Sequence, residues 1–151
     1  MSEIWRPSVT VAAVIERGGR FLLVEEEVEG RRVLNQPAGH LDPDESLVAA
    51  CRREVLEETA HHFAPRALVG IYRWHYAPRD VTFLRLCFCG DLEGVDAGRK
   101  LDRGIIAAPW LTLDELLARK AQHRSPLVER CVRDFLAGKR FPLELLSTEF
   151  A

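Results

Sequence analysis

Residues 39–58 read GHLDPDESLVAACRREVLEE, and this stretch decides how the chain folds. It predicts a helix from His40 to Ala60. Asp42 supplies an N-cap, Pro43 suits the first helical position, and Glu45 stands three residues after the cap. Apolar residues recur along one side of the segment, as in a helix that packs on a core.

Three carboxylates crowd one side of this predicted helix. At about 100° per residue, Glu54, Glu57 and Glu58 fall within an arc of roughly 100°. Like charges at such spacings repel, and the helix dipole disfavours negative charge in the last turn. A bound cation removes both penalties, and hard oxygen ligands favour Mg²⁺ or Mn²⁺ over softer metals. The spacing therefore predicts a divalent-metal site.

A solvated acidic face is the commonest reason for clustered glutamates, but it explains this segment poorly. The carboxylates border the apolar stripe of Leu47, Cys51 and Val55 instead of lying opposite it. The metal interpretation is therefore favoured over the solvated one.

Composition narrows the class of protein. The 151 residues suit one domain, residues 1–151, and we expect a monomer because no long apolar seam is present. A net charge of −2 provides no positive field for a nucleic acid polymer or a membrane, and no apolar run is long enough to span one. The four cysteines lack paired CxxC units, which favours reduced thiols in a cytoplasmic protein.

The rest of the chain mixes strands and helices without strict alternation. A hairpin turn is predicted at 17–20, and charged or acidic loops at 25–32 and 93–104. Strands are predicted at 9–15, 21–24, 33–36, 67–76, 81–92 and 105–110, and further helices at 113–120 and 126–137. The expected fold class is α/β, one domain with helices covering a mixed sheet.

The fixed positions of residues 39–58 resemble the Nudix box, the signature of MutT-like hydrolases of nucleoside diphosphates linked to other groups. The matching residues are Gly39, Glu45, Arg53, Glu54, Glu57 and Glu58. This resemblance implies an α/β/α sandwich around a mixed central sheet, and an enzyme that hydrolyses phosphoanhydride bonds.

Two positions depart from the family pattern, which has glycine and then an aliphatic residue after the paired glutamates. This chain has Ala60 and His61 there. Alanine in the left-handed conformation that closes such a helix costs about 1 kcal/mol. The helix either ends at Ala60 at this cost or runs one residue further and ends at His61.

The resemblance implies a set of metal ligands. Glu57 and Glu58 are expected to bind Mg²⁺, for which Mn²⁺ can substitute, with a backbone carbonyl near Gly39. A further acidic ligand is expected from the loop before the last strand, where Asp102 is the first choice and Asp96 the second.

Catalytic roles are implied for Arg53, Glu54 and Glu57. Glu54 either ligates a second Mg²⁺ or deprotonates the attacking water, and Arg53 holds a neighbouring carboxylate in place. Glu45 either joins that network or only complements the helix dipole, and the second role is favoured.

Segments outside the box resemble a bacterial phosphatase branch of the family. They lie at residues 9–12, 21–26, 35–41, 124–128 and 141–144. This likeness implies release of orthophosphate from nucleoside tri- and diphosphates, hydroxymethylpyrimidine pyrophosphate and thiamine pyrophosphate.

Three residues are candidates for binding the substrate ring. Trp74 either stacks on the ring or packs in the core, and the core is favoured. Asn35 and Gln36 either read the polar edge of the ring or form a turn.

Two other functions stay open. One is a pyrophosphohydrolase of oxidised nucleotides or dinucleoside polyphosphates. The other is a Nudix-fold module that senses a nucleotide without hydrolysing it, which the presence of all three carboxylates disfavours.

Overall fold

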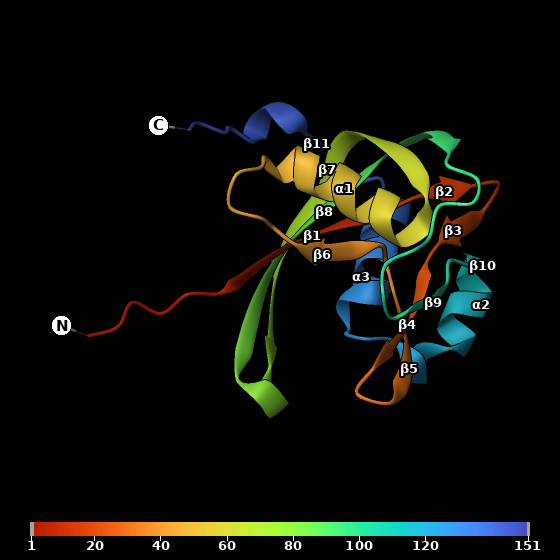
Figure 1. Ribbon diagram of the computed structural model, residues 1–151, viewed down its shortest axis with the longest axis horizontal. Helices are drawn as coiled ribbons and strands as arrows, with labels where there is room; N and C mark the ends of the chain where they lie inside the picture. Colours follow the sequence, from red (N-terminus) through yellow and green to blue (C-terminus); the bar gives the residue numbers. More distant parts are fainter. Residues whose placement is uncertain (1, 151) are drawn as a thin grey trace.

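A five-stranded mixed sheet lies at the centre of the computed structural model, which describes residues 2–150 (Figure 1). Its order is β11-β7-β8-β1-β6. The strands are β1 (Ser8–Val14), β6 (Ala38–His40), β7 (His61–Tyr76), β8 (Val81–Val95) and β11 (Phe141–Pro142). Strand β1 runs parallel to β8, whereas the other pairs are antiparallel. The predicted mixed sheet is confirmed.

Helices cover both faces of this sheet (Figure 1). They are α1 (Leu47–Thr59), α2 (Leu113–Ala118) and α3 (Leu127–Leu136). Successive side chains of β1 alternate between two cores, because side chains of a strand point to opposite faces in turn. Val11 and Ala13 belong to the core with α1 residues, and Ala12 and Val14 to the core with α3 residues. The α/β/α sandwich is therefore confirmed.

Two small sheets flank the central one. The first joins β10 (Trp110–Thr112), β3 (Arg20–Leu22) and β2 (Glu16–Arg17), and the second joins β5 (Arg31–Asn35), β4 (Val24–Val28) and β9 (Ile105–Ala107). Single-turn 3-10 helices lie at Ala77–Arg79, Lys120–Gln122 and Leu143–Leu145. Gly18 and Gly19 have φ of 57° and 79°, so they form the predicted turn between β2 and β3.

The predicted loop at 25–32 is wrong, because these residues form the hairpin of β4 and β5. Its charged side chains have partners from distant parts of the chain. Arg119 Nη1 lies 2.8 Å from Glu25 Oε1, and Arg124 Nη1 lies 2.6 Å from Glu26 Oε2. These partners come from the C-terminal third of the chain, so the local pattern did not reveal them.

The predicted start of the box helix is also wrong. Helix α1 begins at Leu47, and Ser46 caps it by accepting a hydrogen bond of 3.0 Å from the Ala49 N–H. Asp42 and Glu45 lie before the helix, where both approach Arg53. The ion pairs with this arginine, not the helix dipole, therefore place the acidic residues.

The helix ends at Thr59, so the alternative extension to His61 is wrong. Ala60 adopts the left-handed conformation itself, with φ of 62°, and its N–H donates to the Leu56 carbonyl at 2.9 Å. This conformation costs a residue with a Cβ about 1–2 kcal/mol. The pairing of His61 with Val95 at the start of β7 requires the chain to turn at this point.

The long hairpin of β7 and β8 exceeds the predicted strands at both outer ends. Its register runs from the pair His61 and Val95 to the pair Tyr76 and Val81. All four cysteines are free and buried, and within residues 2–150 no helix is long and apolar enough to cross a membrane.

Candidate active site

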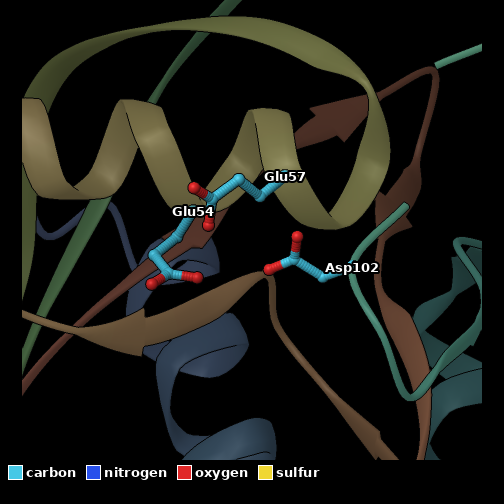
Figure 2. A group of neighbouring side chains, drawn as sticks. All are labelled: Glu54, Glu57 and Asp102. Atoms are coloured by element: carbon cyan, nitrogen blue, oxygen red, sulfur yellow. The ribbon is translucent and has the colours of Figure 1, made fainter. Parts of the chain in front are cut away.

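Three carboxylates from two parts of the chain meet beside helix α1. Glu54 and Glu57 project from the helix, and Asp102 reaches them from the loop between β8 and β9 (Figure 2). One ligand oxygen from each lies within 4.8 Å of the other two. We call Glu54, Glu57 and Asp102 the carboxylate trio. Such a set of hard oxygen donors suits Mg²⁺ or Mn²⁺.

The loop that carries Asp102 is tied to the C-terminal end of the helix. The Asp102 N–H donates to the Glu57 carbonyl at 3.0 Å, which satisfies one of the carbonyls that a helix end leaves unpaired. Asp96, the second choice for this ligand, instead pairs with His62, whose Nε2 lies 2.8 Å from Asp96 Oδ1. The structure therefore brings Asp102, and not Asp96, to the trio.

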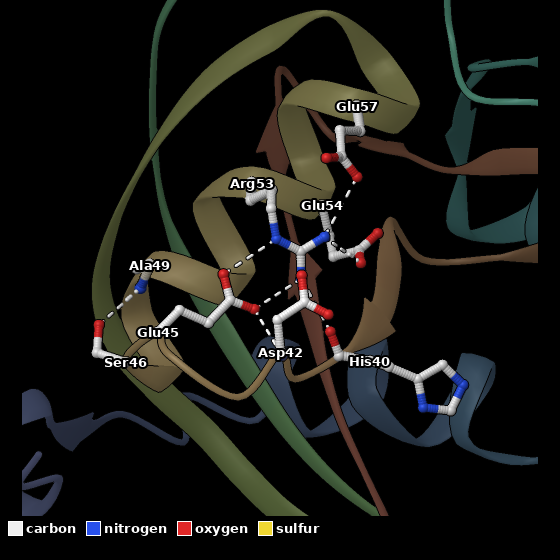
Figure 3. Close-up of polar contacts among 8 residues, drawn as sticks. All are labelled: His40, Asp42, Glu45, Ser46, Ala49, Arg53, Glu54 and Glu57. Carbon is white, nitrogen blue, oxygen red and sulfur yellow. Dashed lines mark hydrogen bonds and ion pairs between the residues drawn. The ribbon is translucent and has the colours of Figure 1, made fainter. Parts of the chain in front are cut away.

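Arg53 lies at the centre of an ion-pair network on the same helix (Figure 3). Its guanidinium contacts four carboxylates: Asp42 at 3.3 Å, Glu45 at 2.7 Å, Glu54 at 2.8 Å and Glu57 at 3.2 Å. It also donates to the His40 carbonyl at 2.9 Å. Glu45 therefore joins the network, and the favoured role of complementing the helix dipole is wrong.

Charge around this arginine is far from balanced. One guanidinium faces four carboxylates, and Asp102 adds a fifth acidic group nearby. Hydrogen bonding to Arg53 lowers the pKa of Glu45, and Glu45 and Glu54 in turn raise the pKa of Arg53. A divalent cation at the trio would neutralise this excess negative charge.

Burial raises the pKa of acidic groups, whereas hydrogen bonding to Arg53 lowers it. Desolvation raises the pKa of Glu54 to about 6, although Arg53 opposes this, and it raises the pKa of Glu58 to about 9. Glu54 therefore keeps its proton to higher pH than an exposed glutamate does, which suits a group that accepts a proton during a reaction.

Glu58 is not one of the trio, although the charges of Glu54 and Asp102 act on it. Its side chain is buried, and Oε1 accepts a hydrogen bond of 2.8 Å from the Ala38 N–H. This bond holds β6 against α1 next to Gly39. The three glutamates of the predicted arc thus differ in their contacts: Glu58 bonds to β6 with one oxygen and lines a cavity together with Glu54, whereas Glu54 and Glu57 form the trio with Asp102.

Mg²⁺ is expected to stabilise the protein more at about pH 8 than at about pH 5. The folded-state pKa values of Glu54 and Glu58 lie above their unfolded values. Both groups therefore increase the free energy of unfolding at low pH, where they are protonated. This contribution is lost as pH rises through about 6 for Glu54 and about 9 for Glu58. A cation competes with these protons and restores stability where the groups are ionised.

The check is a thermal-unfolding series at both pH values, with Mg²⁺ and with EDTA. Glu54→Gln removes one of the titrating groups, so the variant should show a smaller difference between the two pH values. An equal rise in Tm with Mg²⁺ at both pH values in the unmodified protein would contradict the assignment.

A cavity of about 320 Å³ adjoins the trio. Gly39, Glu54 and Glu58 are among its lining residues, so Glu54 belongs to both the cavity and the trio. Trp74 and Phe83 line it too, with ring centroids 5.7 Å apart and planes inclined by 18°. Trp74 thus both packs against the core and faces the cavity.

Asn35 and Gln36 are both buried, and both are held by Arg85. The guanidinium donates to Asn35 Oδ1 at 3.0 Å and to Gln36 Oε1 at 2.9 Å. Gln36 also donates to the Val128 carbonyl at 2.7 Å and does not line the cavity, so it connects β5 to α3 instead of facing a ligand. Asn35 lines the cavity, as does Arg85.

Arg85 is a candidate residue that the sequence pattern missed. It lies between Phe83 and Cys87 on one face of β8 and is only 7% exposed. A single charged residue within the otherwise apolar run 83–89 of a predicted strand was the signal that could have identified it.

Comparisons with known proteins identify the family. The NUDIX domain family matches residues 5–131. Phosphatase NudJ of Escherichia coli K12 is 39% identical over 143 residues, which cover 95% of this chain and 92% of that protein. Phosphatase NudJ of Shigella boydii has the same identity and coverage.

Solved structures show the same fold. A NUDIX hydrolase from Nitrosomonas europaea superposes with a TM-score of 0.94 at 52% identity, covering 95% of this chain and 98% of that chain. A MutT NUDIX hydrolase from Burkholderia pseudomallei superposes with a TM-score of 0.73 at 21% identity, covering 86% and 98%. The chain therefore belongs to the Nudix family, is closely related to phosphatase NudJ, and is a hydrolase that acts on phosphoanhydride bonds.

Proposed function

We propose that this hydrolase is a Mg²⁺-dependent phosphatase that releases orthophosphate from nucleoside tri- and diphosphates, hydroxymethylpyrimidine pyrophosphate and thiamine pyrophosphate. The observation that carries the proposal is that the carboxylate trio and the cavity share Glu54. A phosphate chain at the trio can therefore belong to a molecule whose ring lies in the cavity. The relationship to phosphatase NudJ supports the choice of product.

The donor set fits a divalent cation. Glu57 and Asp102 would hold it together with Glu54, and Glu58 and the carbonyl of Gly39, two residues that line the cavity, complete the proposed set. When bound, the metal polarises phosphoryl oxygens and lowers the pKa of bound water. Mn²⁺, another hard cation, can take the same place.

The side chains around the trio have separate tasks in this proposal. Arg53 holds one oxygen of Glu54 at 2.8 Å, which fixes the carboxylate, so that its other oxygen either ligates a Mg²⁺ or accepts a proton from the attacking water. Arg53 holds Glu57 in the same way at 3.2 Å. Arg53 is thus proposed to act by positioning the two carboxylates.

The decisive experiment identifies the phosphate species that leaves. Purified protein with Mg²⁺ is supplied with GTP, GDP or thiamine pyrophosphate, and orthophosphate and pyrophosphate are measured separately. We expect orthophosphate and GDP from GTP. Pyrophosphate with GMP would support the pyrophosphohydrolase instead, and binding of the nucleotide without turnover would support the sensing module.

We also propose a monomer that acts in the cytoplasm on small molecules and binds neither a nucleic acid polymer nor a membrane. The four buried free thiols and the net charge of −2 support this.

A further inference from the structure

A second cavity, of about 210 Å³, adjoins the cavity beside the trio. We call the cavity beside the trio the first cavity. The two cavities share Trp74, Phe83 and Arg124 as lining residues. No member of the carboxylate trio lines the second cavity, whereas Glu54 lines the first. The first cavity therefore connects the trio with the second cavity.

The second cavity lies between two hairpins. Val28 and Val33 line it from β4 and β5, and Tyr76 lines it from the end of β7. An ion pair between Arg79 and Glu29, which also line the cavity, joins the tips of the two hairpins. In Figure 1 both tips lie at the lower edge of the molecule. The walls of the second cavity therefore come from elements outside the Nudix box.

Three aromatic rings extend from the first cavity to the second. Trp74 and Phe83 line both cavities, and Tyr76 lines only the second. Trp74 and Tyr76 are two residues apart on β7, and Phe83 pairs with Trp74 in register on β8, so the three side chains share one face of the hairpin. The centroid of Trp74 lies 5.7 Å from that of Phe83 and 5.4 Å from that of Tyr76. Aromatic side chains in such a position stack on the bases of nucleotides.

The proposed substrates differ in how far the ring lies from the terminal phosphate. Hydroxymethylpyrimidine pyrophosphate carries its two phosphates on the methyl carbon of the ring, whereas a nucleoside triphosphate has a ribose and a third phosphate in between. Release of orthophosphate places the terminal phosphate of each at the trio. The first cavity, of about 320 Å³, is near the lower limit of about 300 Å³ for ligand pockets. The longer substrate therefore extends beyond it.

Positive charge lies where the two cavities meet. Arg124 lines both, and within residues 2–150 only the Nη1 of its side chain has an acceptor, Glu26 Oε2. Its other side-chain N–H groups can donate to a phosphate chain that passes from one cavity to the other. In the second cavity the acidic residue Glu29 is paired with Arg79, and Arg31 adds a further positive charge. The path from the trio to the second cavity therefore suits a chain of phosphates.

We propose that the second cavity binds the nucleobase of nucleotide substrates, and that Tyr76 sets how well the enzyme uses nucleotides relative to hydroxymethylpyrimidine pyrophosphate. The inference rests on the proposed function and adds a binding site to it. Arg124 contacts the phosphates nearer the ribose, and the base stacks at Tyr76. The shorter substrate reaches only Trp74 and Phe83, in the first cavity.

Tyr76→Ala tests the stacking residue. It should raise KM for GTP about tenfold, the order of effect of losing one base–aromatic stack, and leave kcat unchanged because Tyr76 binds the ground state and the transition state alike. Both constants for hydroxymethylpyrimidine pyrophosphate should stay as in the unmodified protein. Tyr76→Phe keeps the ring and should retain the KM for GTP. An equal rise in KM for both substrates would mean that the variant acts through Trp74, and would overturn the inference.

The matched control for this variant is Phe141→Ala. It also removes an aromatic ring, but Phe141 is 46% exposed on β11 and lines neither cavity. Its KM values for both substrates should equal those of the unmodified protein. The same rise in KM for GTP in Phe141→Ala as in Tyr76→Ala would overturn the inference.

Val28→Trp tests the space itself. Val28 lines the second cavity and not the first, so a larger side chain there occupies the proposed place of the base. KM should rise for GTP and not for hydroxymethylpyrimidine pyrophosphate. The control is Val95→Trp, the same change at a side chain that is 57% exposed and lines neither cavity. An unchanged KM for GTP in Val28→Trp would overturn the inference.

Failure of the proposed function is a separate result. If the unmodified protein with Mg²⁺ hydrolyses neither substrate, the proposed function itself fails. If it hydrolyses hydroxymethylpyrimidine pyrophosphate but not GTP, it is a phosphatase without the proposed nucleotide site. If it hydrolyses both and Tyr76→Ala changes neither KM, only the role of the second cavity is overturned.

Discussion

Glu57→Gln should lower kcat with GTP at least about a hundredfold, the loss expected when a catalytic metal is disturbed. Glutamine has the shape of glutamate and can still accept from Arg53, whose Nη1 lies 3.2 Å from Glu57 Oε2. The change therefore removes charge from the trio and little else. The measurement is steady-state orthophosphate release over a range of Mg²⁺ concentrations, and the apparent requirement for Mg²⁺ should rise.

The control for this variant is Glu93→Gln. Glu93 is exposed on β8, and within the part of the chain that the structure describes it forms no ion pair. The control removes the same charge at a distance from the trio, so its kcat should equal that of the unmodified protein. Equal rates for Glu57→Gln and Glu93→Gln would mean that the trio is not the catalytic site.

Gly39→Ala should also lower kcat about a hundredfold, because a catalytic group displaced by about 1 Å loses activity on this scale. A Cβ on Gly39 would lie 2.1 Å from Glu54 Cδ and 2.2 Å from its Oε1. The flexible Glu54 side chain would have to leave its place beside Arg53. The backbone at Gly39 has no left-handed φ, so alanine itself is not strained there.

The contrast with Gly90→Ala makes this prediction specific. A Cβ on Gly90 would lie 2.0 Å from the backbone oxygen of Ala64, in the pairing of β7 with β8. Backbone cannot move aside as a side chain can, so this variant should lose about 3 kcal/mol or more of unfolding free energy. Gly39→Ala should unfold within about 1 kcal/mol of the unmodified protein in urea, so its loss of activity is not a loss of fold.

A Gly39→Ala variant that keeps full activity would show that catalysis does not depend on where Glu54 lies. The assay and the unfolding curve should be measured on the same preparation. Only the combination of normal stability and low kcat supports the role given to this position.

The cavity of the candidate site was harder to predict than the carboxylate trio. Asn35 was a candidate from sequence, but the residue that holds its side chain is Arg85, which is 50 residues away along the chain. Gln36 was a candidate for the same reason, and a contact with Val128 on α3 gives it a structural task instead. Local patterns show which residues are polar and buried, but not which partner each will find.

The sequence alone was sufficient for features that depend on short spacings. Helical periodicity placed Glu54 and Glu57 on one side of α1, and two adjacent glycines predicted the turn between β2 and β3. Such features need only the geometry of a few consecutive residues.

Tertiary structure decided what depends on distant partners. Asp42 and Glu45 form ion pairs with Arg53 instead of capping the helix. A backbone hydrogen bond to Glu57 holds Asp102 beside the trio's other two carboxylates. Glutamates of one helix have different contacts: Glu58 bonds to β6, and Glu57 lies with Asp102 in the trio. Charge, burial and hydrogen bonding act across space, so a carboxylate's role is settled only once the chain has folded around it.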